Sequence, residues 1–89
     1  MSTVNVFSVR DQKANGFLQP FYLPNESVAY RAMYDCLSDP EHQFTKHPED
    51  YSLYHLGEFD FETGKFTTHD TPEHIVSLAV LYSKTLSGE

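Results

Sequence analysis

Cysteine and tryptophan are the residues that this chain has least of. Its 89 residues include one cysteine, Cys36, and no tryptophan. A single cysteine excludes an internal disulfide, which suits a reducing cytoplasm. Long apolar runs are also lacking, since none approaches the roughly 20 residues that cross a bilayer. Residues 1–5 carry neither the basic nor the apolar region of a signal peptide, so we expect a protein that is neither exported nor membrane-bound.

Positive charge is scarce as well. Six Lys and Arg stand against thirteen Asp and Glu, which gives a formal net charge of −7. Phosphate contacts come mainly from Lys and Arg, so this composition argues against simple nucleic-acid binding. An acidic chain can still bind nucleic acid if its few cations gather on one face and its acids lie elsewhere.

Aromatic residues are plentiful, with seven Phe and six Tyr. A chain of this size buries only about 60–70% of its unfolded surface, and aromatic rings add buried area per residue. We expect one domain, residues 1–89, frayed at 1–3 and 87–89. The small core and the surplus of aromatic rings also favour a homodimer.

The first half predicts two strands and a helix. Residues 4–10 are rich in β-branched and aromatic side chains, and residues 17–23 form a second strand after a turn at 11–16. Pro20 cannot donate a ladder hydrogen bond, which predicts an edge strand or a bulge. Asn25 is the expected N-cap of a helix that ends at Leu37. Its apolar stripe comprises Val28, Ala29, Ala32, Met33, Cys36 and Leu37.

The second half predicts a polar loop over residues 41–50, anchored by Phe44, and then strands at 52–59 and 65–69. Gly64 supplies the left-handed position of the hairpin between these strands. Thr71-Pro72-Glu73 has the pattern of a helix start. The predicted stripe of that helix comprises Ile75, Leu78, Ala79, Tyr82 and Leu86.

The predicted order is therefore ββαββα, an α+β domain with a mostly antiparallel sheet. Both helices can cover one face of that sheet. The other face is then solvated, paired in a dimer, or used for binding.

Histidines and acids invite a metal interpretation. His69, Asp70, Glu73 and His74 lie close together in the sequence. Neither His-Glu-x-x-His nor paired Cys-x-x-Cys is present, so we expect surface residues at a helix N-terminus, no metal and no cofactor. His42 and His47 with Glu49 and Asp50 form no stronger pattern.

Catalytic patterns are equally weak. Cys36 lies on the apolar stripe of the first helix, where a cysteine commonly packs as a small hydrophobe. The sequence shows no Ser-His-Asp order, no Gly-rich phosphate loop and no paired-carboxylate motif. We expect a protein that is not an enzyme.

Short fragments spread along the chain carry a family resemblance through their order and spacing. They are Val6-Phe7-Ser8-Val9, Asp11 with Lys13-Ala14, Pro20-Phe21-Tyr22-Leu23-Pro24-Asn25, His42-Gln43-Phe44 before Lys46, His47-Pro48-Glu49-Asp50-Tyr51, Leu56-Gly57-Glu58-Phe59-Asp60 and Thr63-Gly64. Over residues 6–72 the chain resembles the small nonstructural protein of gokushovirus-type microviruses (Microviridae), tailless phages with single-stranded DNA genomes. The resemblance implies a protein of the host cytoplasm, outside the virion, that binds single-stranded DNA during genome replication or packaging.

Single-strand binders combine cations with aromatic faces on a sheet. The candidate DNA-binding residues are Arg10, Lys13, Phe17, Phe21, Tyr22, Arg31, Lys46, Tyr51 and Tyr54. Each ring could instead be a core residue, and the acidic hairpin tip with Glu58, Asp60 and Glu62 should repel DNA. The alternative function is an acidic protein–protein adaptor, or a DNA mimic, that acts on a host or phage replication or assembly factor.

Overall fold

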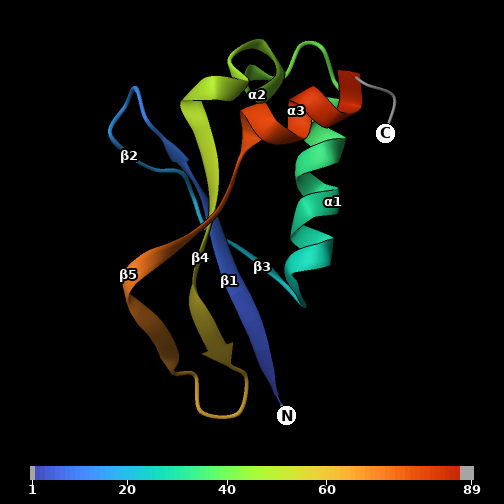
Figure 1. Ribbon diagram of the computed structural model, residues 1–89. Helices are drawn as coiled ribbons and strands as arrows, with labels where there is room; N and C mark the ends of the chain where they lie inside the picture. Colours follow the sequence, from blue (N-terminus) through green and yellow to red (C-terminus); the bar gives the residue numbers. More distant parts are fainter. Residues whose placement is uncertain (1, 87–89) are drawn as a thin grey trace.

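The computed structural model describes residues 2–86 and shows an α+β domain with an antiparallel sheet, as predicted. Figure 1 shows the elements in chain order. They are β1 (Thr3–Asp11), β2 (Gly16–Phe17), β3 (Phe21–Leu23), α1 (Glu26–Leu37), α2 (Gln43–Lys46), the 3₁₀ helix η1 (Pro48–Asp50), β4 (Tyr51–Asp60), β5 (Phe66–Ser77) and α3 (Leu78–Leu86). Of the residues expected to be frayed, 1–3 and 87–89, residues 1 and 87–89 lie outside the described residues, and Thr3 lies in β1.

The sheet has the order β2-β1-β4-β5, and β3 pairs with the same edge of β1 as β2. The predicted second strand is therefore split in two, with Pro20 in the gap. Because proline has no N–H to donate, the strand breaks there while Leu18 still donates its N–H to the Val9 carbonyl at 2.8 Å. The edge position predicted for this strand is confirmed.

The core lies between the sheet and the two longer helices. α1 runs alongside the sheet, and α3 crosses near the end of α1 (Figure 1). Of the predicted α1 stripe, Ala29, Met33 and Leu37 are buried, and the other three members are half-buried. The Asn25 side chain accepts a hydrogen bond from the Val28 N–H at 3.0 Å, which confirms the predicted N-cap.

The segment between α1 and β4 is more regular than the predicted loop. It contains α2 and η1, and buried Phe44 anchors it against Tyr51, with 4.7 Å between the ring centroids. The His42 side chain caps α2 by accepting from the Phe44 N–H at 3.1 Å.

The helix start predicted at Thr71-Pro72-Glu73 is wrong. β5 continues through these residues, and α3 begins only at Leu78. Pairing with β4 outweighs the local capping pattern, and Pro72 lies in an irregular stretch of an edge strand, where its missing N–H costs no ladder bond. In the predicted stripe Leu78 is buried, Leu86 is 71% exposed, and the buried side chain one turn along is Leu81.

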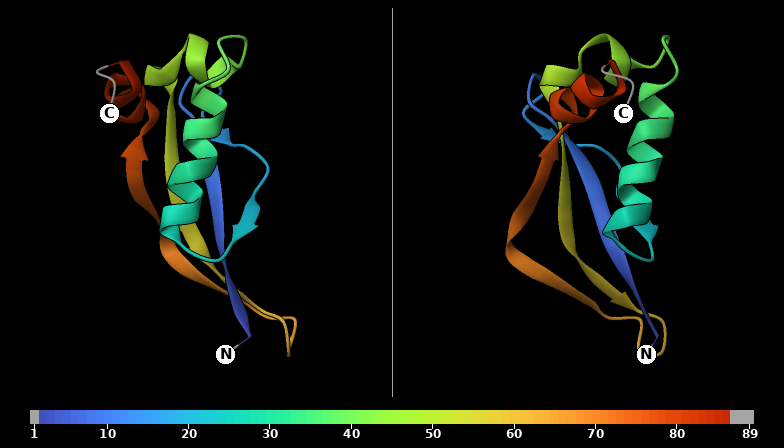
Figure 2. Two further views of the ribbon diagram at one scale, coloured as in Figure 1. Left: turned by 90° about the vertical axis from the view of Figure 1, so that its right-hand side faces the viewer. Right: turned by 45° about the vertical axis from the view of Figure 1, so that its right-hand side comes forward.

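One end of the sheet extends beyond α1 as a narrow arm (Figure 2). We call the arm residues 3–6 of β1, 57–60 of β4, 66–68 of β5 and the connecting turn at 61–65. Gly64 adopts φ 74° in that turn, which confirms the predicted left-handed position. The elongated molecule measures 42 × 27 × 19 Å.

Candidate nucleic-acid interface on the open sheet face

One face of the sheet points away from α1. Directly opposed residues of an antiparallel pair project to the same side, so the strand register identifies this face. Arg10 is opposite Phe17 across β1 and β2, and Tyr54 is opposite both Ser8 and His74. Ser8 and Arg10 lie two residues apart on β1, so their side chains project to the same side of the sheet. Phe17, Tyr54 and His74 therefore share this open face with Arg10.

An aromatic and polar cluster occupies the end of this face near the β1–β2 turn. Tyr54 contacts Phe17 and His74 edge-on, with ring centroids 5.2 Å apart in both pairs. A cavity of about 220 Å³ adjoins the rings, and its lining is formed by Arg10, Gln12, Ser52, Tyr54 and His74. We call these five residues and Phe17 the Arg10 cluster.

Arg10 is the cation of this cluster. Its guanidinium donates to the Asn15 side-chain oxygen, which holds it over the turn. A guanidinium has five N–H donors, so it retains donors for an oxygen-rich ligand. Lys13 lies in the same turn, where the Asp11 carboxylate accepts from the Lys13 N–H at 3.0 Å and from the Ala14 N–H at 3.2 Å. The cluster therefore combines a cation, hydrogen-bonding groups and aromatic rings.

The remaining predicted DNA-binding residues are dispersed. Phe21 stacks on Phe7 at 6.1 Å, and Tyr51 is only 7% exposed, so both rings belong to the core side of the sheet. Arg31 is exposed on α1, and Lys46 on α2 pairs with Glu41 at 3.6 Å. The predicted surface is reduced to Arg10, Phe17 and Tyr54, with Lys13 in the adjoining turn and Tyr22 in a second cluster.

Sequence reasoning missed Gln12, Ser52 and His74. The sequence predicts His74 at the start of a helix, whereas the structure places it on β5 opposite Tyr54. Strand alternation along β4 could have indicated Ser52, because it shares a side with Tyr54.

The second cluster on the open face is apolar and lies on the arm and on the adjoining strand β3. A cavity of about 390 Å³ is lined by Val4, Tyr22, Phe59, Phe61 and Phe66, which we call the arm cluster. Phe61 is 64% exposed and Phe66 55% exposed, even though both rings contact Phe59. Exposed apolar patches of this kind often mark interaction surfaces.

Cys36 packs against the core from the α1 stripe, as predicted, although it is half-buried rather than fully buried. Burial together with Asp35 and Asp39 raises its thiol pKa, which makes it a poor nucleophile. The sequence group of His69, Asp70, Glu73 and His74 is divided. His69 and Glu73 meet His55, whereas His74 contacts Tyr54. A further group capable of holding a cation comprises His47, Glu49 and Asp50.

These features define a small α+β protein with an aromatic open sheet face. The model of one family, described as Phage ORF5 protein, matches residues 4–81. The chain therefore belongs to the phage ORF5 protein family. Neither the curated proteins nor the solved structures gave a match. Within residues 2–86, every helix is too short or too polar to span a membrane.

Proposed function

We propose that this phage protein binds single-stranded DNA through the Arg10 cluster, without catalysing a reaction. The process served is genome replication or packaging in the host cytoplasm, with the protein outside the virion. The main observation behind this proposal is that Arg10 lies on the same sheet face as the exposed ring of Phe17, which contacts Tyr54. Membership of a phage family and the resemblance to the gokushovirus nonstructural protein support the same function.

The cluster has the chemistry that an unpaired strand requires. Unpaired bases expose their faces, and base–aromatic stacking contributes about 1–3 kcal/mol per base. Phe17 is 42% exposed, so its ring is accessible to a base. Arg10 supplies a charged donor for a neighbouring phosphate, and the hydroxyl and amide groups of Ser52 and Gln12 supply hydrogen bonds.

The charge of the chain sets the expected strength of binding. Six cations against thirteen acids neutralise few phosphates, so affinity should be moderate. At the hairpin tip, the Asp60 carboxylate stabilises the turn itself, because it accepts hydrogen bonds from the Glu62 N–H at 2.8 Å and from the Thr63 N–H at 3.4 Å. That tip lies on the arm, at the opposite end of β4 from the Arg10 cluster.

A charge-matched pair of variants tests the location of binding. Arg10→Gln should weaken binding of a labelled single-stranded oligonucleotide and lower the steepness of its logarithmic salt dependence by about 0.7, the value for one phosphate contact. Arg31→Gln removes the same charge from the exposed side of α1 and should change neither quantity beyond a small long-range effect. Equal losses in both variants would exclude the Arg10 cluster as the binding site.

A ring variant tests stacking separately from charge. Phe17→Ala removes an exposed ring and should weaken binding about 5- to 150-fold while leaving the salt dependence unchanged. Unchanged affinity would show that no base stacks on Phe17.

The arm cluster favours a second role in self-association. Its exposed rings would be covered by a second copy of the chain, and an interaction of this kind is also what a protein–protein adaptor requires. We expect sedimentation at low micromolar concentration to give twice the 10.2 kDa chain mass. The double variant Phe61→Thr with Phe66→Thr should sediment as a monomer, whereas Phe17→Thr, on the Arg10 cluster, should remain a dimer. A monomeric native protein would exclude this role.

A further inference from the structure

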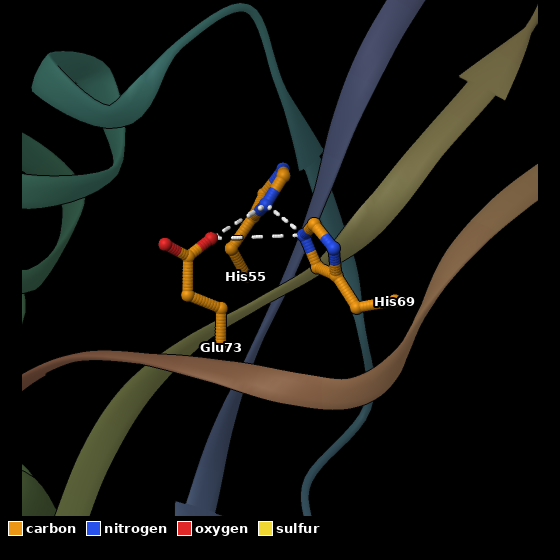
Figure 3. A group of neighbouring side chains, drawn as sticks. All are labelled: His55, His69 and Glu73. Carbon is orange, nitrogen blue, oxygen red and sulfur yellow. Dashed lines mark hydrogen bonds and ion pairs between the residues drawn. The ribbon is translucent and has the colours of Figure 1, made fainter.

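Three side chains from two strands converge on one point beside the base of the arm. The His55 Nδ1 atom on β4 lies 2.8 Å from His69 Nε2 on β5. One carboxylate oxygen of Glu73, also on β5, lies 3.5 Å from the first nitrogen and 3.6 Å from the second. Figure 3 shows the three groups pointing toward one another.

An irregular stretch of β5 makes this convergence possible. Residues four apart on a regular strand are separated by about 13 Å, given a rise of 3.3 Å per residue. The register instead moves from Gly57 opposite Thr68 to His55 opposite Glu73, so residues 69–72 of β5 arch out while only one residue of β4 lies between the paired positions. The arch brings His69 back to Glu73, and both then face His55.

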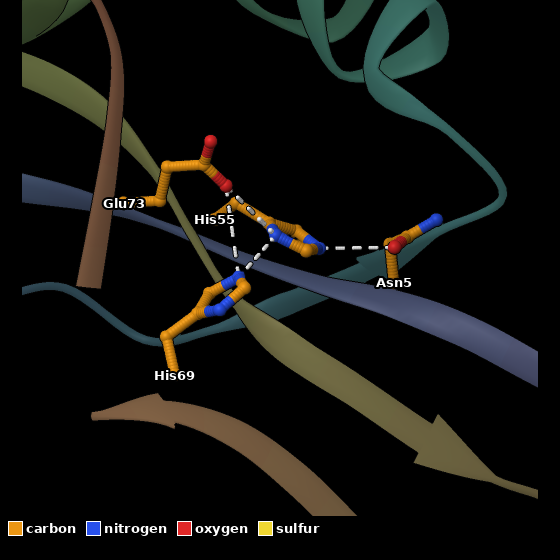
Figure 4. A network of polar contacts seen from close by, with 4 residues as sticks. All are labelled: Asn5, His55, His69 and Glu73. Carbon is orange, nitrogen blue, oxygen red and sulfur yellow. Dashed lines mark hydrogen bonds and ion pairs between the residues drawn. The ribbon is translucent and has the colours of Figure 1, made fainter. Parts of the chain in front are cut away.

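A chain of hydrogen bonds fixes which nitrogen of His55 faces the cluster (Figure 4). The Pro24 carbonyl can only accept, and the Asn5 side-chain NH₂ donates to it at 2.7 Å. The Asn5 amide oxygen therefore faces His55 Nε2, at 2.9 Å, and must accept a hydrogen bond from an N–H group at that nitrogen. With its proton on Nε2, neutral His55 presents the Nδ1 lone pair to the other two residues.

Packing holds the same ring in place. The fully buried Phe7 ring lies 5.2 Å from the His55 ring, whose side chain is only 17% exposed. His69 and Glu73 are more accessible, at 41% and 62%. A cavity of about 240 Å³ adjoins His55 and Glu73, and Glu26 of α1 adds a second carboxylate to its lining.

We infer that His55, His69 and Glu73 form a binding site for a divalent transition-metal ion of the zinc type. Two imidazole nitrogens and one carboxylate oxygen are a ligand set that Zn²⁺ favours, and a second-shell amide that orients a ligating histidine is typical of such sites. The three interatomic distances define a triangle whose centre lies about 1.9 Å from each donor atom. This distance is slightly shorter than the zinc–donor bond lengths of about 2.0–2.2 Å. The ion would sit slightly out of that plane.

The fourth coordination position would be left to water or to a ligand in the adjoining cavity. Binding requires a lone pair on His69 Nε2, so the proton that this nitrogen donates to His55 moves to His69 Nδ1 through solvent. Since the cluster joins β4 to β5 where the arm begins, the ion would cross-link the two strands at that joint.

Calorimetric titration of the native protein with Zn²⁺ tests the site, because it measures affinity and stoichiometry together. We expect one ion per chain, together with a rise in the melting temperature that a chelator reverses. His69→Gln and Glu73→Gln should each weaken binding at least tenfold, and because both side chains are accessible these variants should fold normally.

Two histidine variants serve as controls. His74→Gln changes the neighbouring histidine on β5, which contacts Tyr54, and His47→Gln changes the histidine of the other acidic group. Both should bind Zn²⁺ like the native protein. Native-like binding by His69→Gln, or a loss confined to His47→Gln, would overturn the assignment. Nitrogen NMR of the imidazoles gives an independent readout, because Zn²⁺ should shift His55 Nδ1 and His69 Nε2 and leave His74 unchanged.

Discussion

Gly57 is the glycine at which adding a single methyl group should destabilise the fold most. It is buried at an irregularity of β4, opposite Val6 on one side and Thr68 on the other. A Cβ atom here would lie 2.1 Å from the Thr67 carbonyl oxygen and 2.7 Å from the Thr68 Cα. Both are backbone atoms of the paired strand, so no side-chain rotation can relieve the overlap.

We expect Gly57→Ala to lower the free energy of unfolding by about 2–4 kcal/mol, because β5 must move away from β4. A domain of this size has a free energy of unfolding of about 4–13 kcal/mol, so the loss is a large fraction of the total stability. Each kcal/mol corresponds to about 4–8 °C in the melting temperature. Urea and thermal unfolding followed by circular dichroism measure both quantities.

Two other glycines separate steric overlap from backbone strain. Gly64 has φ 74° but open space around its Cβ position, so Gly64→Ala should cost about 1 kcal/mol through strain alone. Gly16 has open space and no such φ, so Gly16→Ala should change stability by less than about 1 kcal/mol. If Gly57→Ala unfolds at the same urea concentration as Gly16→Ala, the close approach of β4 and β5 at Thr67 is refuted.

Three further predictions concern the core and its titrating groups. Met33→Ala should cost about 2–5 kcal/mol in urea unfolding, whereas Arg31→Ala on the exposed side of α1 should stay within about 0.5 kcal/mol; equal effects would reject the packing of α1. Cys36 should react with a thiol reagent at pH 8 several-fold more slowly than free cysteine, because burial, Asp35 and Asp39 raise its pKa, and an equal rate would contradict this. Burial, Asp11 and Asp50 raise the pKa of Tyr51 above its unfolded value of about 10. The stability that protonated Tyr51 contributes is therefore complete below about pH 10 and is lost as the pH rises through the folded pKa. Tyr51→Phe should reduce this alkaline loss of stability, measured as the urea midpoint against pH, and an unchanged pH profile would refute the prediction.

The parts of the fold that depend on residues close together in the sequence were predictable. The Asn25 cap, the apolar spacing of α1 and the Gly64 turn are local signals, and the structure contains all three. Pro20 likewise predicted the edge position of its strand, because a proline has no N–H to donate to a neighbouring strand, although the split into β2 and β3 was not predicted.

Features that depend on strand pairing were not predictable from the same signals. Thr71-Pro72 reads locally as a helix start, but β5 is paired with β4 on both sides of these residues, at Thr68 and at Glu73, and it continues through them. The open face could be anticipated as an aromatic surface, yet register alone decides that Phe17 faces outward while Phe21 faces the core. His55 lies 14 residues before His69, and no periodic pattern foretells the arch that brings them together.

Binding of single-stranded DNA is the central claim, and one titration tests it most directly. A labelled single-stranded oligonucleotide and the corresponding duplex are each titrated with native protein at two salt concentrations. We predict tighter binding of the single strand, and an affinity that falls with salt at a logarithmic slope of about −0.7 per phosphate contacted. Absence of binding at low salt and high protein concentration, or equal affinity for the duplex, would contradict the proposed function.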